Sequence, residues 1–377
     1  MRAPPPAGRI VPFAAFAAST MACALLVGLE DKEALDEPLE AAPEAASTPG
    51  ERDDAAPAST ILASDQAKPW GIAVDGPYVY WTNEGDGTVL RIDHRGGAAT
   101  FVAKNQPEPH QILVDGEQVV WHNANLANRN GDDAGNELLE IAFVPKGDVG
   151  KIVAPGAIDK RRGVSNLRRL AMAPSADTFI FGTRSDEVRR YQRDTESNDR
   201  QMQGGLDGRD PTAIAADSTY LYWFLQARHE LWRAGKSAEL GGDEAGADPA
   251  LLATIVTNPE IADMVVDEGR LFAVTKSGVV LKIDAADAGA PQVLATGFAF
   301  PHAIAQDANN VYFTHGNDDV EGQGQIVMVP KAGGAAKVLA GGLGKLRGVA
   351  AGAASDGTPT VFWASYGDGT IRSVAAR

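Results

Sequence analysis

Short apolar runs separated by turn-forming residues recur through most of the chain. The clearest group comprises Pro69-Trp-Gly-Ile-Ala-Val-Asp75, Val79-Tyr-Trp-Thr82, Gly87-Thr-Val-Leu-Arg-Ile-Asp93 and Thr100-Phe-Val-Ala103. Each run is rich in β-branched or aromatic residues and is bounded by Gly, Pro, Asn or Asp, which is typical of β-strands joined by turns. The third run alternates apolar and polar positions, as expected for a strand with one exposed face. This group therefore predicts a unit of four strands.

The same group returns six more times, at intervals of about 45 residues. Three copies keep the opening proline and the aromatic second run, and they start at Pro109, Pro211 and Pro301. Three are more degenerate and start at Leu167, Ile261 and Leu346. A four-stranded unit at this period is the sequence signature of one blade of a β-propeller. We therefore expect an all-β fold with seven blades.

The two ends of the repeat region complete each other. The last copy stops after its third strand, Thr370–Val374, and an isolated strand at Thr60–Ala63 precedes the first copy. Pairing these two segments supplies the missing fourth strand and closes the ring without an open edge. We therefore expect residues 59–377 to form one seven-bladed β-propeller whose N-terminal strand closes the last blade.

A different pattern precedes the repeats. Residues 10–29 carry no charge and follow Arg2 and Arg9, as in a signal peptide or an N-terminal anchor. The chain's one cysteine, Cys23, is a candidate for lipidation; the alternatives are cleavage at a nearby small residue and retention of residues 1–29 as an anchor. All three outcomes predict export to the periplasm, the cell surface or the medium. We expect contact with a membrane only through this segment or a lipid on it.

Residues 30–58 are rich in Ala, Pro and acidic residues and have no sustained apolar face, which predicts a disordered acidic linker. The whole chain has 34 Lys and Arg against 50 Asp and Glu, a formal net charge of −16. An acidic chain without a basic face repels a phosphate backbone, so we expect no nucleic-acid partner. The repeat region has no cysteine and must be stabilised by packing alone. We expect it to be a monomer.

The Pro-x-x-Ile-Ala-x-Asp openings and Val79-Tyr-Trp-Thr-Asn83 resemble the repeats of extracytoplasmic propellers of the YWTD and NHL types and, more closely, of the virginiamycin B lyase-like group. The Gly-Gly pair at 96–97 belongs to the same likeness, which covers nearly all of residues 59–377. Propellers of these kinds include binding modules, lyases, lactonases and scaffolds. Virginiamycin B lyase-like enzymes use histidine and a divalent metal, so the resemblance makes a divalent cation the one cofactor to consider. Their ligand motif has no residue-by-residue match in this chain.

One repeat position is expected to face the mouth of the central channel. It lies two residues before the inner-strand isoleucine position, where the chain enters the inner strand. Round the ring this position is Trp70, His110, Arg168, Thr212, Ala262, His302 and Arg347. Arginines suit carboxylate or phosphate groups because the guanidinium can form two parallel hydrogen bonds. The sequence therefore predicts a binding propeller for a small anionic ligand, or for an extracellular protein or glycan, at this mouth.

The loops after the second strands are expected on the same face and add further polar residues. They place His122 beside His110 and His315 beside His302, and they add Glu84. Histidines grouped with acids can hold a divalent metal or transfer protons near neutral pH. This makes a metal-assisted lyase or lactone hydrolase the alternative function, and a scaffold without a small-molecule site the third. The candidate ligand-binding residues are Trp70, Glu84, His110, His122, Arg168, His302, His315 and Arg347; none is assigned a catalytic or metal role.

Two other features are interpreted as structural. The aspartates that end the inner strands are expected to form turns on the opposite face; they are Asp75, Asp115, Asp217, Asp267 and Asp307. Residues 123–137 and 315–324 form long loops rich in Asn, Asp and Gly that flank the predicted mouth. We interpret them as solvated insertions, with calcium binding as the alternative.

Overall fold

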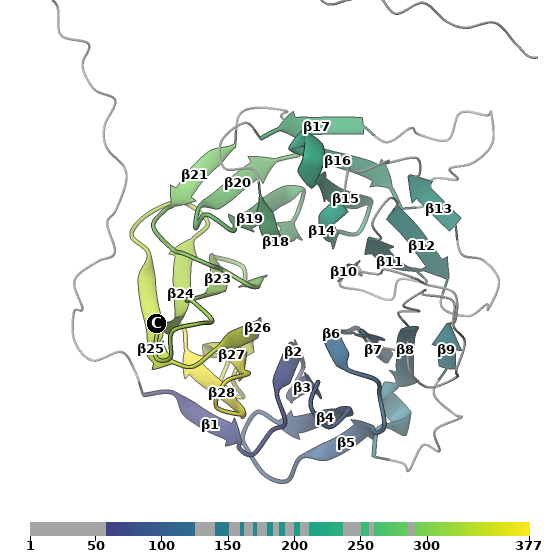
Figure 1. The fold of residues 1–377 in the computed structure, drawn as a ribbon, viewed down its shortest axis with the longest axis vertical. Coiled ribbons are helices and arrows are strands. Elements are labelled where there is room, and N and C mark those ends of the chain that lie inside the picture. The colour runs from purple at the N-terminus through teal and green to yellow at the C-terminus, as the bar shows by residue number, and fades with distance from the viewer. Residues whose placement is uncertain are drawn as a thin grey trace, which may run out of the picture. The chain divides into compact units, whose positions relative to one another are not determined.

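The strand pattern of the sequence recurs as seven four-stranded antiparallel sheets in the computed structural model (Figure 1). The structure describes residues 58–124, 140–150, 159–161, 169–171, 179–183, 188–192, 200–203, 211–236, 250–255, 260–285 and 291–377. The expected leader, the linker up to residue 57, Cys23 and Arg168 lie outside the described residues. In the described part of the chain, no helix is long and apolar enough to span a membrane.

Within each blade, the chain runs from the innermost strand of the ring to the outermost. Blade 1 contains β2 (Pro69–Asp75), β3 (Tyr78–Asn83), β4 (Thr88–Asp93) and β5 (Thr100–Ala103). Blade 2 contains β6 (Pro109–Val114), β7 (Gln118–Asn123), β8 (Glu140–Pro145) and β9 (Asp159–Arg161). Blade 3 contains β10 (Arg169–Ala171), β11 (Phe179–Thr183), β12 (Val188–Gln192) and β13 (Arg200–Gln203). Blade 4 contains β14 (Pro211–Ala216), β15 (Tyr220–Leu225), β16 (Glu230–Gly235) and β17 (Ala250–Thr254).

The remaining blades repeat this order. Blade 5 contains β18 (Ile261–Asp267), β19 (Arg270–Thr275), β20 (Val280–Asp284) and β21 (Gln292–Ala295). Blade 6 contains β22 (Ile304–Gln306), β23 (Asn310–His315), β24 (Gly324–Pro330) and β25 (Lys337–Leu343). Blade 7 contains β26 (Leu346–Ala353), β27 (Pro359–Ser365) and β28 (Thr370–Ala375). Two single-turn 3₁₀ helices, η1 (Lys146–Asp148) and η2 (Gln226–Arg228), follow β8 and β15.

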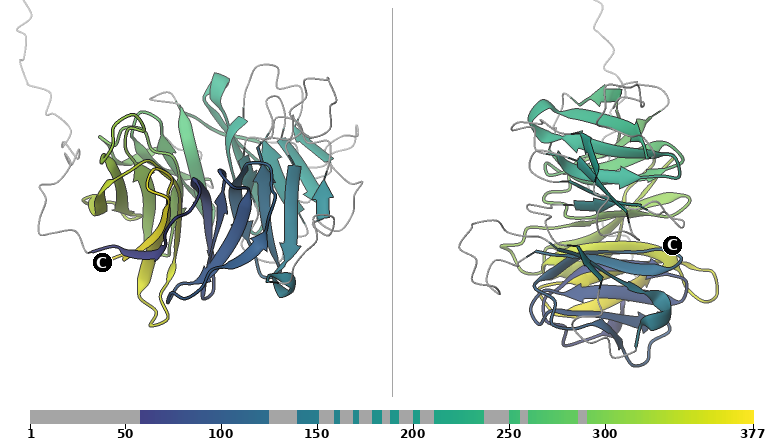
Figure 2. Two further views of the ribbon diagram at one scale, coloured as in Figure 1. Left: turned by 60° about the horizontal axis from the view of Figure 1, so that its bottom comes forward. Right: turned by 90° about the vertical axis from the view of Figure 1, so that its right-hand side faces the viewer.

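The N-terminal strand closes the ring. β1 (Thr60–Ala63) pairs antiparallel with β28, with Thr60 opposite Ser373, and becomes the fourth strand of blade 7. Figures 1 and 2 show the purple β1 beside the yellow β28. The seven inner strands contact one another in a closed circle: β2, β6, β10, β14, β18, β22 and β26. The predicted seven-bladed propeller and its closing strand are both confirmed.

Aromatic residues of the second strands fill the space between blades. Trp81, Trp121, Trp223 and Trp363 are fully buried, as are Tyr80, Tyr222 and Tyr312. Tyr80 of blade 1 lies in one apolar cluster with Trp121 of blade 2, and Tyr312 of blade 6 with Trp363 of blade 7. A large buried aromatic on each second strand therefore ties one blade to the next through apolar surface removed from water.

Two of the buried indole N–H groups, those of Trp81 and Trp121, receive acceptors from the chain that joins two blades. The Gln66 side-chain oxygen accepts hydrogen bonds from Trp81 Nε1 (2.9 Å) and Asn83 Nδ2 (3.0 Å). Gln106 does the same for Trp121 Nε1 (3.2 Å) and Asn123 Nδ2 (3.1 Å). These glutamines satisfy buried donors, whose desolvation would otherwise cost stability.

Three of the five aspartates at the ends of the inner strands form turns on the face opposite the strand entrances, as predicted. The Oδ1 atoms of Asp115, Asp217 and Asp307 each accept two backbone N–H groups from the following turn. Asp75 and Asp267 instead form ion pairs with Lys146 and Lys331 of the next blade. This face is therefore explained by turn formation and by contacts between blades.

We predict that Gln106→Leu destabilises the propeller by about 1–3 kcal/mol, because two buried donors lose their acceptor. Gln292→Leu, the same change at an exposed position of β21, is the control and is expected to alter the free energy of unfolding by less than about 0.5 kcal/mol. Urea unfolding of both variants measures the difference. Equal effects would contradict the role given to Gln106.

Candidate functional site

Four residues at the predicted mouth position form a continuous row across blades 6, 7, 1 and 2. The Trp70 and His110 rings are stacked, with centroids 4.0 Å apart and planes 8° from parallel. The Arg347 guanidinium carbon lies 4.9 Å from the Trp70 ring centroid. The Arg347 Nη1 atom lies 3.4 Å from His302 Nε2. We call this row, His302–Arg347–Trp70–His110, the mouth arc.

Glycine and threonine bring these residues together. Gly71 follows Trp70, and a Cβ atom there would lie 2.3 Å from the backbone oxygen of His110 in the next blade. Gly348 follows Arg347, and a Cβ atom there would lie 2.8 Å from the backbone oxygen of Trp70. The missing side chains let neighbouring inner strands approach closely enough for their first side chains to stack.

The threonine of the Tyr-Trp-Thr pattern links the same two strands. Thr82 Oγ1 accepts the Gly71 N–H (2.9 Å) and donates to the His110 backbone oxygen (2.5 Å). Thr314 repeats this in blade 6: it accepts the Ala303 N–H (3.1 Å) and donates to the Arg347 backbone oxygen (3.5 Å). The second strand of one blade therefore holds the mouth residue of the next.

A carboxylate covers each end of the mouth arc. Glu84, in the turn between β3 and β4, lies 3.1 Å from His110 Nε2 and accepts the Tyr366 hydroxyl at 3.0 Å. Asp318, in the loop between β23 and β24, pairs with both terminal nitrogens of Arg347 at 2.7 and 3.1 Å. Asp318 also lies 3.2 Å from His302 Nε2 and 3.2 Å from Lys345 Nζ.

The rim beside the arc is rich in positive charge. The Tyr366 ring lies edge-on to Trp70, with centroids 5.8 Å apart. Its centroid is 5.1 Å from the Arg347 guanidinium carbon, 5.5 Å from Lys345 Nζ and 5.9 Å from Lys68 Nζ. Lys68 also lies 3.8 Å from Glu84. Three cations therefore surround one aromatic ring, an arrangement stabilised by the ring's negative faces.

Burial and the neighbouring charges shift the acid–base behaviour of the site. Burial lowers the pKa of His110 and His302 despite the adjacent carboxylates, and Arg347 lowers both further. Burial opposes ionisation of Asp318, but Arg347, His302 and Lys345 together lower its pKa. The pKa of Tyr366 is raised by burial and by its hydrogen bond to Glu84. At neutral pH each histidine is therefore uncharged, and each faces its carboxylate through Nε2.

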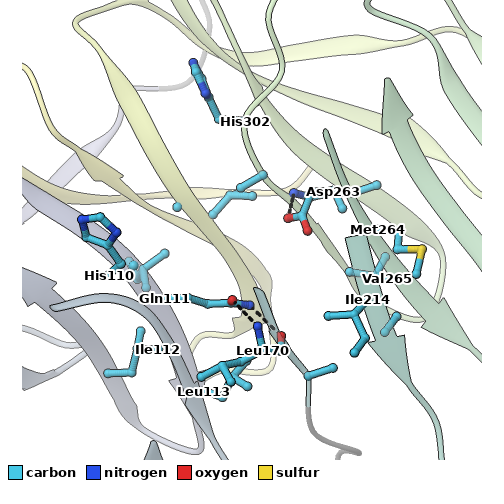
Figure 3. Close-up of a pocket in the computed structure, with 18 of the residues that line it drawn as sticks. His110, Gln111, Ile112, Leu113, Leu170, Ile214, Asp263, Met264, Val265 and His302 are labelled. Atoms are coloured by element: carbon cyan, nitrogen blue, oxygen red, sulfur yellow. Dashed lines mark hydrogen bonds between the residues drawn. The ribbon is translucent and has the colours of Figure 1, made fainter. Parts of the chain in front are cut away.

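Beneath the arc lies a channel cavity of about 620 Å³. Below the entrance its walls combine apolar side chains, among them Ile112, Ile214 and Met264, with the polar Gln111, Asp263 and Gln306. Figure 3 shows His110 with Ile112 on one side of this space and Ile214 with Met264 on the other. The Gln111 amide forms two hydrogen bonds with the backbone of Leu170 in the next blade, so it serves blade packing.

Most of the residues predicted for the mouth come together. The mouth arc contains four of them, Trp70, His110, His302 and Arg347, and Glu84 pairs with His110 at one end of it. His122 lies edge-on to His110, with ring centroids 5.6 Å apart. His122 is only 5% exposed, although it lines the cavity. Arg168 lies outside the described residues.

His315 lies apart from this group. Its Nδ1 atom is 2.8 Å from the backbone oxygen of Ala299, to which it donates, and its ring packs edge-on against Phe298 with centroids 5.5 Å apart. Gly316 N–H donates to the same oxygen at 3.2 Å. His315 therefore fastens together the two loops of blade 6 that carry His302 and Asp318.

Sequence reasoning missed Tyr366, Lys68 and Lys345. A closer comparison of copies would have found them, because Tyr366-Gly-Asp-Gly-Thr aligns with Glu84-Gly-Asp-Gly-Thr. Lys68 and Lys345 both stand two residues before an arc residue. In the described segments, no three His, Cys, Asp or Glu side chains are grouped so that they could hold a metal ion.

We predict that Gly71→Ala destabilises the domain by about 1–3 kcal/mol, because the new methyl group displaces the His110 backbone. Gly116→Ala is the control, since a Cβ atom there meets open space at an ordinary backbone angle. Thermal unfolding compares the two, and near-ultraviolet circular dichroism follows the Trp70–His110 stack. A Gly71→Ala variant as stable as the control would contradict the proposed close packing.

The lowered pKa values of His110 and His302 predict a loss of stability on acidification. In the unfolded chain both imidazoles bind protons below their ordinary pKa of 6.5, whereas the folded domain resists protonation. The unfolded state then binds more protons, so the free energy of unfolding falls as the pH drops below 6.5. Urea unfolding across pH 5–8 is expected to show a flatter profile for His110→Gln/His302→Gln. An unchanged slope would contradict this assignment.

Comparison with known proteins identifies the fold. No protein-family model and no curated protein sequence matches the chain. The chain is similar to virginiamycin B lyase from Staphylococcus aureus, with TM-score 0.62 and 16% identity over 85% of this chain and 99% of that one. It is also similar to the WD40 β-propeller domain of Doa1 (TM-score 0.59, 13% identity, 85% and 98% covered) and to the computationally designed protein Ika8 (0.53, 13%, 84% and 98%). At these identities the likeness establishes a β-propeller and leaves function to the site.

Proposed function

We propose that this chain is an extracytoplasmic binding propeller that takes a small organic anion at the channel mouth. One observation carries the proposal: Lys68, Lys345 and Arg347 converge on the Tyr366 ring beside the arc, above a cavity of about 620 Å³. That volume falls within the range of small-molecule sites, which combine apolar walls with a few placed polar groups.

The charge of the rim supports an anion. At the rim itself, Glu84 and Asp318 oppose three cations, which leaves one positive charge at this level. Deeper in the cavity, the Asp263 carboxylate accepts the Ile304 N–H (3.2 Å), so the surplus positive charge is confined to the rim. Below the rim, Ile112, Ile214 and Met264 offer apolar contact. A ligand with a negatively charged head and an apolar body would match both levels of the site.

The proposed location rests on the uncharged segment 10–29, whose sequence is typical of exported proteins. An extracellular protein or glycan partner at the same mouth, a metal-assisted lyase and a scaffold are the competing functions. The lyase hypothesis depends on the histidines, and His110 and His302 each lie beside a carboxylate.

A ligand screen tests the proposal. The purified chain is heated with aliphatic and aromatic monocarboxylates, inorganic phosphate, neutral sugars, and Mg²⁺ or Ca²⁺. We expect organic anions to raise the unfolding midpoint, since a ligand at 100 times its Kd stabilises by about 2.7 kcal/mol. Arg347→Gln is expected to lose this response. Lys345→Gln, which removes a charge with less disturbance of the packing, is expected to lose it as well.

Arg228→Gln is the matched control, because Arg228 is an exposed arginine after β15 in blade 4, outside the arc. It is expected to respond like the parent chain. Stabilisation by sugars alone would favour the glycan alternative, and stabilisation or turnover that requires a divalent ion would favour the lyase. No response to any compound would favour the scaffold. Each of these three results contradicts the anion-binding proposal.

A further inference from the structure

The Asp318 carboxylate lies in a cradle made by three other residues. Its Oδ1 atom faces Arg347 Nη1 (3.1 Å) and His302 Nε2 (3.2 Å). Its Oδ2 atom faces Arg347 Nη2 (2.7 Å) and Lys345 Nζ (3.2 Å). Each carboxylate oxygen thus has two donors, which matches its two lone pairs. We call His302, Lys345 and Arg347 the carboxylate cradle.

The geometry of the cradle favours one chemical class of ligand. The two parallel contacts from the planar guanidinium fit a planar group with two equivalent oxygens. Lys345 and His302 then complete the coordination with one donor for each oxygen. A tetrahedral phosphate has further oxygens outside this plane, for which this set provides no donor. The cradle therefore suits a carboxylate better than a phosphate.

The loop that carries Asp318 differs from the turn that carries Glu84. Glu84 belongs to the tight turn 84–87, which is fixed by hydrogen bonds around the buried Asn83 and Thr88. The Asp318 loop is longer, and glycines with left-handed backbone angles stand towards both its ends: Gly316 (φ 143°) and Gly322 (φ 78°). Its base is fastened at Ala299, while Asp319 and Val320 near its tip are exposed. Hydrogen bonds from the Asp319 N–H to Asn317 Oδ1 (2.9 Å) and from the Val320 N–H to the Asn317 backbone oxygen (3.1 Å) close a turn around Asp318, whose side chain contacts the cradle.

We infer that Asp318 is a built-in substitute ligand, and that a carboxylate ligand binds by replacing it in the cradle of His302, Lys345 and Arg347. This inference rests on the proposed function and names the ligand class for the same site. The Asp318 side chain is 25% exposed, so the pair is accessible to a competing carboxylate from solvent. The lowered pKa of Asp318 agrees with a cradle that favours a negative carboxylate. The unliganded site is then self-inhibited.

Chemical rescue tests the inference. Asp318→Ala empties the cradle while keeping its three residues, and sodium acetate supplies the missing carboxylate. We expect acetate to raise the unfolding midpoint of Asp318→Ala saturably, and at concentrations at least about tenfold lower than the parent chain requires. Sodium benzoate, measured by calorimetry, is expected to bind Asp318→Ala at least about tenfold more tightly than the parent chain. Inorganic phosphate at equal ionic strength is expected to do neither.

Asp319→Ala is the matched control, because it removes the same charge from the same loop at an exposed position. It is expected to behave like the parent chain, and Asp318→Ala/Lys345→Gln is expected to lose most of the gain. If Asp318→Ala does not fold, Asp318→Asn keeps the shape of the side chain and removes its charge, and the same measurements apply. Equal benzoate affinity in the variant and the parent chain would overturn the inference. An equal gain for phosphate would overturn the carboxylate assignment.

The results separate the inference from the proposed function. Organic anions that stabilise the parent chain without any gain in Asp318→Ala would leave the binding function standing and refute the substitute ligand. Acetate rescue of Asp318→Ala in a chain that responds to no organic anion would establish the cradle and refute the function. Failure of both measurements would refute both.

Discussion

The close approach of neighbouring inner strands is the constraint on which both the ring and its mouth depend. Gly71 and Gly348 allow a backbone oxygen of the next blade to lie where a Cβ atom would otherwise stand. Thr82 and Thr314 then bond to that next strand. Because equivalent positions are brought so near to one another, the first side chains of four successive blades meet. The mouth arc is therefore a consequence of how the blades pack.

The same packing explains why charge can be gathered at the mouth of an acidic chain. Arg347 lies against the Trp70 ring and faces Asp318, so its charge is balanced from two sides. His110 and His302 are kept neutral by burial, and each uses one nitrogen to hold a carboxylate. The site is stabilised as a network, in which the removal of one member leaves another without its partner.

The sequence predicted the fold well because its separate patterns all indicate the same architecture. Period, turn residues, buried aromatic positions and the strand at Thr60–Ala63 all indicate seven blades closed by the N-terminal strand, as observed. The site could be predicted only in part. The repeat predicted that Trp70, His110, His302 and Arg347 lie on one rim, because they occupy the same position in their copies and equivalent positions in a propeller share a face. It could not reveal that His315 turns to Ala299, since that depends on how two loops of blade 6 meet. Nor could it show that Asp318 faces Arg347 in the next blade, because spacing along the chain does not report such a contact.

Packing between blades builds a carboxylate site that Asp318 fills in the unliganded chain. The most direct measurement is a crystal structure of the chain grown or soaked with benzoate. We expect the benzoate carboxylate between Arg347, Lys345 and His302, its ring towards the channel, and Asp318 turned out of the cradle. A benzoate bound elsewhere on the propeller, with Asp318 still paired to Arg347, would contradict this expectation.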